Sequence, residues 1–302
     1  MIASRSPLRA VLVATDLSAP ARHAAGRGAA LAAADGAALT LVHALGAGAL
    51  DQLRRWLEGD AEAALRADAE RRLQGLAGAL AAAHAGLQVD TRLASGRVVD
   101  AIGAEAARVR ADHVVCGTRG AGFLRRQLLG STAEHLARRS APPVLMVRTP
   151  PRAPYRRVIV AVDFSRFSAV SLAQALRVAP AADVVLLHAV TVPMESQLRL
   201  AGVADSALAR YREAVRGDAR AQLQALAGAA GLDPARVQLL APDGADAWMQ
   251  IAEAEQALDA DLVVVGRQGR DAVEALLLGS TTRMVIAECS ADVLIATAEG
   301  DA

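Results

Sequence analysis

The sequence predicts two tandem α/β domains, each an open Rossmann-like sheet of five parallel strands flanked by helices. Two observations predict this fold. Short, β-rich apolar runs alternate along the chain with long segments rich in alanine, leucine, arginine and glutamate, and the same series of motifs occurs twice. Strands that are apolar on both faces and separated by helices pair in parallel through right-handed crossovers.

In the first half of the chain these runs follow one another in a regular order. The apolar runs predict strands at residues 8–15, 38–44, 87–93, 113–116 and 144–147. The segments between them predict helices at residues 19–34, 51–85, 98–110 and 131–140. Ligands of open parallel sheets bind at the carboxyl ends of strands, so the residues after the first and fourth strands are candidates for a site.

The second half repeats the first in the same order, which indicates duplication of a domain of roughly 150 residues. "LRAVLVATDLS" corresponds to "YRRVIVAVDFS", which places Asp163 147 positions after Asp16. "LTLVHAL" corresponds to "VVLLHAV", which pairs His43 with His188. We expect domains at residues 1–150 and 154–302, joined by an exposed, proline-rich linker at 148–157.

Composition narrows the class of protein. The net charge of +1 argues against a nucleic-acid or membrane-binding surface, and the longest uncharged run is shorter than a membrane span. All 33 basic residues are arginine, which excludes chemistry that requires lysine, including the phosphate loop with an invariant lysine and Schiff-base catalysis. Cys116 and Cys289 form no metal-binding pattern, so we expect a cytoplasmic protein without a bound structural metal.

A glycine-rich segment is the strongest candidate for a site, and it also occurs twice. Gly117 and Gly120 follow the fourth predicted strand, and Gly130 with Ser131 opens the next helix. Missing Cβ atoms let the backbone approach a ligand closely, and the start of a helix attracts anions through unpaired amides and its positive dipole end. This pattern favours a ligand with a sugar and phosphates. Glycines before a serine at a helix start are also common without any ligand.

The spacing G-x2-G-x9-G-[S/T] resembles the signature of the ATP-binding branch of the universal stress proteins, a family with an adenine nucleotide α hydrolase-like fold. The resemblance covers nearly the whole chain as two tandem domains. It implies that the protein is a stress-response sensor or regulator that binds ATP, with magnesium as a candidate ion on the phosphates. The implied nucleotide-binding residues are Thr15, Asp16, Ala44, Gly117, Gly120, Gly130, Ser131 and Thr132, and then Val162, Asp163, Ala189, Gly266, Gly269, Gly279, Ser280 and Thr281. In the family the residue after the histidine is often valine, so Ala44 and Ala189 leave the adenine wall less filled.

The resemblance also implies how the halves associate. Single domains of this family dimerise through the last strand, here residues 144–147 and 293–296. Two domains in one chain would make that contact intramolecular, as a pseudo-dimer that could dimerise further. A ligand-free interaction scaffold of the same fold and a slow ATPase or related nucleotide enzyme are the alternatives, and no residue pattern marks a catalytic residue or a protein partner.

Several other residues could have either a functional or a structural role. Asp16 and Asp163 could assist a metal ion on the phosphates, cap the following turn or lie on the adenosine side, which we favour. His43 and His188 have apolar neighbours, which favours hydrogen-bonded core residues over catalysts. Cys116 lies in a predicted buried strand and is expected to be unreactive.

The two glycine segments differ in charge. Residues 118–129 carry three arginines and no acid, whereas residues 267–278 carry two arginines, including Arg267, and two acids. We therefore expect the first site to bind phosphates more strongly.

Overall fold

The computed structural model describes residues 6–56, 60–118, 130–244, 246–268 and 278–297. The strands of the first half are β1 (Ala10–Ala14), β2 (Ala38–Gly46), β3 (Val89–Gly96), β4 (His113–Gly117) and β5 (Val144–Val147). Its helices are α1 (Ala19–Asp35), α2 (Ala47–Trp56), α3 (Ala61–Ala83), α4 (Val98–Arg108) and α5 (Ser131–Arg139).

The second half repeats this order of elements. Its strands are β6 (Arg157–Ala161), β7 (Asp183–Leu187), β8 (Val237–Leu240), β9 (Leu262–Gly266) and β10 (Asp292–Ala296). Its helices are α6 (Phe167–Val178), α7 (Glu195–Leu200), α8 (Asp205–Ala229), α9 (Ala247–Leu258) and α10 (Ser280–Glu288), with a short 3-10 turn at Pro234–Arg236.

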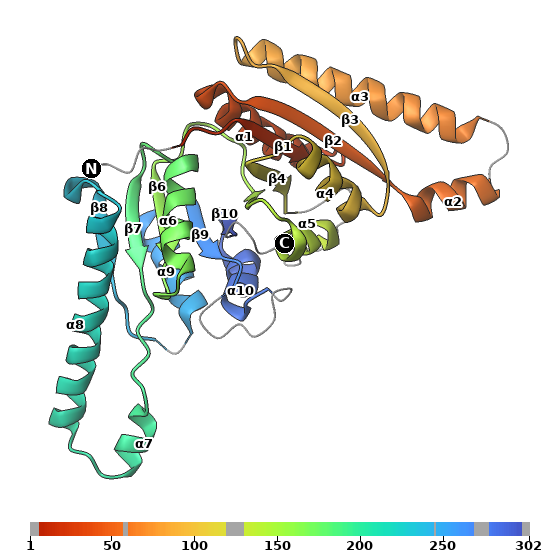
Figure 1. Ribbon diagram of the computed structural model, residues 1–302. Coiled ribbons are helices and arrows are strands. Elements are labelled where there is room, and N and C mark those ends of the chain that lie inside the picture. Colours follow the sequence, from red (N-terminus) through yellow and green to blue (C-terminus); the bar gives the residue numbers. More distant parts are fainter. Residues whose placement is uncertain (1–5, 57–59, 119–129, 245, 269–277, 298–302) are drawn as a thin grey trace.

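The two halves form one continuous ten-stranded sheet with the order β3-β2-β1-β4-β5-β10-β9-β6-β7-β8 (Figure 1). Pairing within each half is parallel, as the sequence predicts. The halves meet where β5 pairs with β10 in antiparallel fashion, with Leu145 opposite Leu294. The last strands of the two halves are therefore in contact, and neither of them is a free edge that could pair with another chain.

Helices cover both faces of the sheet and bury an aliphatic core on each. One core cluster joins α1 and α3 to α6 and α8, and the other joins α4 and α5 to α9 and α10. Both clusters contain residues of both halves. Small residues allow close packing: a Cβ on Gly28 of α1 would lie 2.4 Å from Cγ2 of Val13 in β1, so only glycine fits there.

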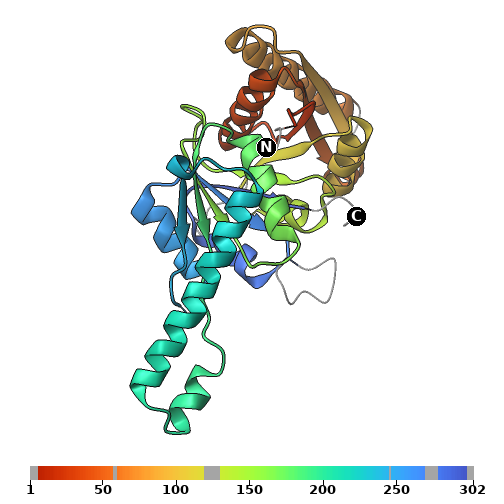
Figure 2. The same ribbon diagram turned by 60° about the vertical axis from the view of Figure 1, so that its left-hand side comes forward.

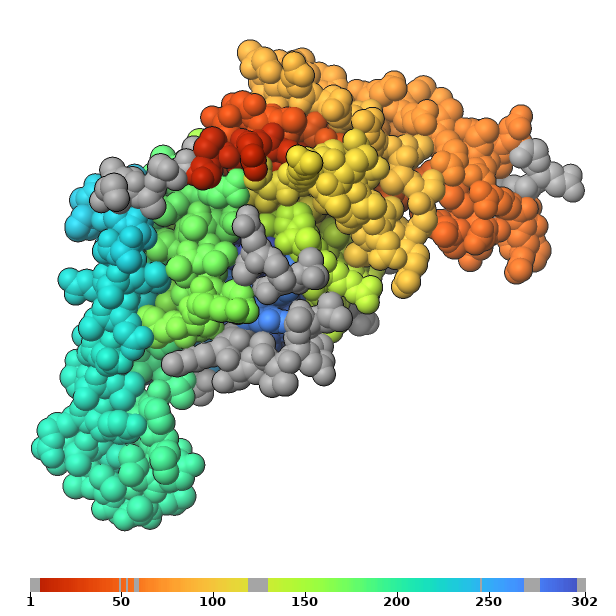
Figure 3. Space-filling view, viewed as in Figure 1, coloured from red at the N-terminus to blue at the C-terminus, as the bar shows by residue number. Residues whose placement is uncertain are grey.

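The predicted helix at residues 51–85 is wrong in its extent. The structure has two helices, α2 and α3, and Asp60 between them lies in a turn at the N-cap of α3. Gly59 and Asp60 both have low helix propensity, and aspartate favours helix starts. In the second half, α7 and α8 form an arm that extends beyond the sheet (Figures 2 and 3).

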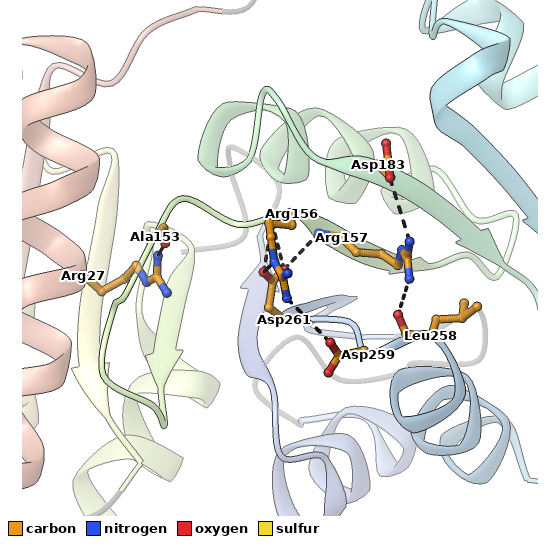
Figure 4. A network of polar contacts seen from close by, with 8 residues as sticks. All are labelled: Arg27, Ala153, Arg156, Arg157, Asp183, Leu258, Asp259 and Asp261. Carbon is orange, nitrogen blue, oxygen red and sulfur yellow. Dashed lines mark hydrogen bonds and ion pairs between the residues drawn. The ribbon is translucent and has the colours of Figure 1, made fainter.

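The linker between β5 and β6 is not exposed along its whole length. Tyr155 is buried, and its hydroxyl donates a 2.7 Å hydrogen bond to the fully buried carboxylate of Asp292 in β10. The guanidinium of Arg27 lies over the Tyr155 ring and also donates to the carbonyl of Ala153 (Figure 4). These contacts fix the linker against both halves, because a buried tyrosine hydroxyl and a buried carboxylate each need a partner.

No helix in the described part of the chain combines the length and the apolar character that a membrane span requires.

Candidate functional site

A cavity lies at the carboxyl ends of β1, β2 and β4, where the sequence predicts a ligand. Its volume is about 190 Å³. Residues of the strand ends, of the start of α5 and of α4 face it. From the predicted set of the first half, the lining includes Thr15, Asp16, Ala44, Gly117, Gly130, Ser131 and Thr132. Gly120 lies outside the described residues.

The segment after β1 is a tight turn held by its own side chains. The hydroxyl of Thr15 accepts a hydrogen bond from the amide of Leu17, and the carboxylate of Asp16 accepts one from the amide of Ser18. Leu17 has a φ of 63°, a left-handed conformation that non-glycine residues rarely adopt. Such strain is concentrated at functional sites, where the surrounding structure enforces it.

His43 joins the first two strand ends. Its Nδ1 lies 2.8 Å from the carbonyl oxygen of Thr15, which fits an Nδ1–H donor. The predicted hydrogen-bonded role is thus confirmed, and the imidazole positions the Asp16 turn against β2. His188 makes the same contact with the carbonyl of Val162 at 2.7 Å.

The start of α5 presents unpaired amides to the cavity. Gly130 is the N-cap, and its own amide donates to the carbonyl of Thr118 at 2.9 Å, which closes the base of the glycine segment. Gly130 has no side chain with which to cap the helix, and the amides of Ser131, Thr132 and Ala133 have no intrahelical partner because they lie in the first turn. Gly130 has φ −65° and ψ 141°, which any residue can adopt. Backbone conformation therefore does not require glycine here.

The second half builds a corresponding cavity of about 480 Å³ at the ends of β6, β7 and β9. Its lining includes most of the predicted residues, namely Val162, Asp163, Ala189, Gly266, Gly279, Ser280 and Thr281. Gly269 lies outside the described residues.

The geometry of the first cavity recurs in the second. Phe164 has a φ of 59°, like Leu17, and Gly279 caps α10 in an extended conformation. The carboxylate of Asp163 also accepts hydrogen bonds from the hydroxyls of Ser165 and Ser168. In both halves the aspartate therefore caps the following turn.

Arg267 does not contribute its charge to the second cavity, which corrects the charge comparison made from the sequence. Its side chain is buried and its guanidinium donates to the carbonyl of Ser140 at the end of α5 in the first half. Its backbone borders the second site, where its carbonyl accepts a hydrogen bond from the amide of Gly279 at 3.0 Å. A Cβ on Gly266 would lie 3.1 Å from the carbonyl oxygen of Gln268, so a larger residue there would have to shift the turn by a few tenths of an ångström.

Cys116 lines the first cavity but is not a nucleophile at neutral pH. Burial raises the pKa of its thiol to about 12, so the thiol stays protonated. The expectation from the sequence agrees with this environment.

Comparison with known proteins decides the family. The model of the universal stress protein family matches residues 7–148 and again residues 154–297. The chain belongs to the universal stress protein family. Each match covers one five-stranded half of the chain, so this universal stress protein carries two tandem domains of the family.

Solved structures of similar fold extend over nearly the whole of this universal stress protein. A universal stress protein from Archaeoglobus fulgidus DSM 4304 has 20% identity and a TM-score of 0.70, covering 96% of this chain and 98% of its own. A functionally unknown protein from Pseudomonas aeruginosa PAO1 has 19% identity and a TM-score of 0.63, covering 97% and 94%. A search of curated proteins finds no match.

Sequence reasoning missed the residues that line the cavities from neighbouring helices. In the first half these are Val98 and Ile102 of α4, and in the second they are Phe167 and Ser171 of α6 and Ile251 of α9. One feature of the sequence could have indicated these residues. Val98 lies at a helix start shortly after the third strand, and such a residue faces the same edge of the sheet as the strand end.

Proposed function

We propose that this universal stress protein binds ATP in the cavities of both domains and acts as a cytoplasmic regulator in the stress response. The observation that carries the proposal is the start of α5, repeated at α10. There a glycine in an ordinary extended conformation precedes amides without intrahelical partners, and these amides border a cavity. The backbone conformation does not require glycine at this position. A reason for glycine is then that a side chain there would point into the cavity, which supports the proposal that a ligand occupies it.

The chemistry of the lining suits the two ends of a nucleotide. Val42, Ala44 and Ile102 give the first cavity apolar walls for a base. Ser131 and Thr132 offer hydroxyls and amides at the positive end of the α5 dipole, where phosphate oxygens are stabilised. The same division holds in the second cavity, with Ile251 on the apolar side and Ser280 and Thr281 on the polar side.

We propose binding rather than catalysis. Asp16 and Asp163 accept hydrogen bonds from the turns that follow them, and His43 and His188 are bonded to backbone carbonyls through Nδ1. These groups therefore stiffen the cavity. Phosphoryl transfer at enzymatic rates requires a positioned nucleophile in addition to bound phosphates.

Mass spectrometry of the nucleotide released from the denatured, purified protein is the first test. Bound ATP supports the proposal, bound ADP alone favours the enzyme, and an empty protein that also fails to bind added ATP favours the ligand-free scaffold. Calorimetric titration with ATP and magnesium, and with GTP for comparison, then measures affinity. The double variant Ser131→Ala with Thr132→Val keeps the amides and removes the hydroxyls, so we expect first-site affinity to fall about five-fold, from the loss of roughly 1 kcal/mol.

A further inference from the structure

A second hollow lies between the domains, at the opposite ends of the strands from the candidate nucleotide cavities. We call it the interdomain groove. It is about 620 Å³ in volume and is lined by the residues that precede β1, β4 and β5, by one side of α4 along its length and by the end of α5. Gln174 and Arg177 of α6 and Thr297 after β10 close it from the second domain. This volume falls within the range of sites for small molecules.

The lining of the groove carries more positive than negative charge, with four arginines and two aspartates. Asp112 forms an ion pair with Arg177 at 2.8 Å, and Asp100 forms one with Arg97 at 3.5 Å. The other three cations, Arg9, Arg110 and Arg139, have exposed side chains and form no ion pair within the described part of the chain. Three unpaired guanidinium groups around one hollow create a positive potential that concentrates anions.

The duplicated domain provides an internal comparison, and it shows that the fold does not require these charges. The positions that correspond to Arg9, Arg110 and Arg139 are Arg156, Asp259 and Glu288. Two of the three arginines are thus replaced by acids at the same helix ends. There Arg156 pairs with Asp259 at 3.6 Å and with Asp261 at 3.8 Å, so its charge is neutralised (Figure 4).

Arg110 occupies its position at a cost. It has a φ of 49° at the end of α4, where glycine or asparagine is favoured. Asp259 adopts the same conformation with a φ of 50°, and aspartate tolerates it better than arginine does. An arginine without a partner at a strained position is better explained by a ligand than by stability.

The floor of the groove is apolar. Ala106, Leu136 and Pro143 line it near the arginines, and Val99 lines it further along α4. Guanidinium groups bind carboxylates and phosphates through paired hydrogen bonds. We propose that the interdomain groove binds a small organic polyanion, with its acidic groups on Arg9, Arg110 and Arg139 and its apolar body against this floor. This site is separate from the proposed ATP sites and does not depend on them.

The test uses benzene-1,3,5-tricarboxylate, which carries three acids on an apolar ring, with phenyl phosphate as a phosphate arm and benzoate as a single-charge control. Calorimetric titrations are run with and without saturating ATP. We expect the tricarboxylate to bind with a dissociation constant below about 1 mM at low salt, to weaken at high salt, and to be unaffected by ATP. Failure of ATP binding would leave this result intact, so the two proposals are distinguishable. If phenyl phosphate binds as tightly as the tricarboxylate, and the arginine variants weaken the binding of both equally, the natural ligand of the groove is a phosphate ester.

Matched variants locate the site. Arg139→Gln should weaken binding about five-fold, whereas Arg138→Gln on the same turn should not, because Arg138 faces Glu134 at 3.6 Å outside the groove. The double variant Arg110→Asp with Arg139→Glu carries the residues of the second domain, so it should fold normally and lose binding. Nuclear magnetic resonance should show shifts at Gly103 and Ala141 on titration.

Unchanged binding in the folded double variant would overturn the proposal, as would equal affinity for benzoate and the tricarboxylate. The acids Glu299 and Asp301 follow Thr297 in the sequence. If Glu299→Gln with Asp301→Asn raised the affinity more than five-fold, the groove would belong to the chain's own acidic segment, and the proposal of an external ligand would be wrong.

Discussion

The guanidinium of Arg267, which follows β9 in the second domain, donates a hydrogen bond to the backbone carbonyl of Ser140, at the end of α5 in the first domain. Helix α5 begins at the first candidate phosphate site and ends at this contact. The hydroxyl of Thr297 donates to the neighbouring carbonyl of Ala141 at 2.8 Å. In the opposite direction, Arg148 of the first domain donates to the carbonyl of Ile286 in α10. Each domain therefore supplies an arginine to the helix that borders the candidate phosphate site of the other.

Replacing Arg267 should weaken the association of the domains. Arg267→Thr introduces the residue that the first domain has at the corresponding position, Thr118. It removes a charged donor from a side chain that is only 5% exposed and leaves the carbonyl of Ser140 with one partner fewer. We expect the free energy of unfolding in urea to fall by about 2 kcal/mol. Arg220→Thr, at an exposed ion pair of 3.7 Å, is the control and should change little. Equal stability of the Arg267 variant and the wild type would show that the contact contributes nothing.

The two ATP sites should differ in affinity. With Arg267 directed to Ser140, the sequence between Gly266 and Gly279 offers the second site one arginine against two acids, whereas residues 118–129 hold three arginines and no acid. Gly130→Val should abolish binding at the first site and remove the tighter phase of a calorimetric titration with ATP and magnesium. Gly279→Val should remove the weaker phase. The extended N-cap conformation accepts valine, so circular dichroism should show both variants folded.

The volumes of the two cavities favour the opposite order of affinity from the charges of their loops. The second cavity is larger, at about 480 Å³ against about 190 Å³. If Gly279→Val removed the tighter phase, space rather than loop charge would govern affinity. Unchanged binding in a folded double variant would rule out the proposed phosphate site altogether.

His113 should make the protein sensitive to mild acid. Burial in β4, together with the nearby charge of Arg177, lowers the pKa of its imidazole to about 4. The unfolded chain takes up a proton near pH 6.5 and the native state does not, so stability falls as the pH falls from 6.5 towards 4. By pH 5 the loss from this group is on the order of 2 kcal/mol.

The variant His113→Leu tests this directly, because the corresponding residue of the second domain is Leu262. Neither ring nitrogen of His113 makes a hydrogen bond of normal geometry within the described residues, and Gln174 is the one side chain near enough to raise the pKa of the ring by a weak contact, so leucine removes at most that contact. We expect the variant to gain stability over the wild type as the pH is lowered from 7 to 5, measured by urea unfolding at each pH. A constant difference between the two proteins across this range would contradict the assignment.

Met194 offers a stabilising change. It precedes α7 with a φ of 56°, and 65% of its surface is exposed. Asparagine tolerates this left-handed conformation, so Met194→Asn should raise the free energy of unfolding by about 1 kcal/mol without loss of buried area. Met194→Val, with a branched Cβ, should lower it. The opposite order of the two variants in thermal unfolding would show that strain at this residue is not significant.

The order of the strands along the chain and the duplication were determined by the sequence alone, and the sequence also predicts the position of the candidate site. The helices of the first half follow from the sequence too, except that residues 51–85 form two helices rather than one. Apolar runs such as "VLVA" and "VVVG" form strands buried on both faces, because only a covered parallel sheet accepts them. The glycine segment ends at the start of α5, where Gly130 is the N-cap and glycine followed by serine favours a helix start. These are local preferences, so they can be seen in one short stretch at a time.

Other features were decided only by the tertiary structure. The sequence places Arg267 in a phosphate-binding segment, but its side chain reaches a carbonyl 127 residues away because that carbonyl lies across the β5–β10 junction. The sequence predicts an exposed linker, but Tyr155 within it is buried, with its hydroxyl on Asp292 and its ring against Arg27. Arg9, Arg110 and Arg139 are distant in the sequence and share a groove only because the amino ends of parallel strands meet at one edge of the sheet. Long, flexible arginine side chains can reach any of several partners, and which of them lies within reach depends on how the two domains pack.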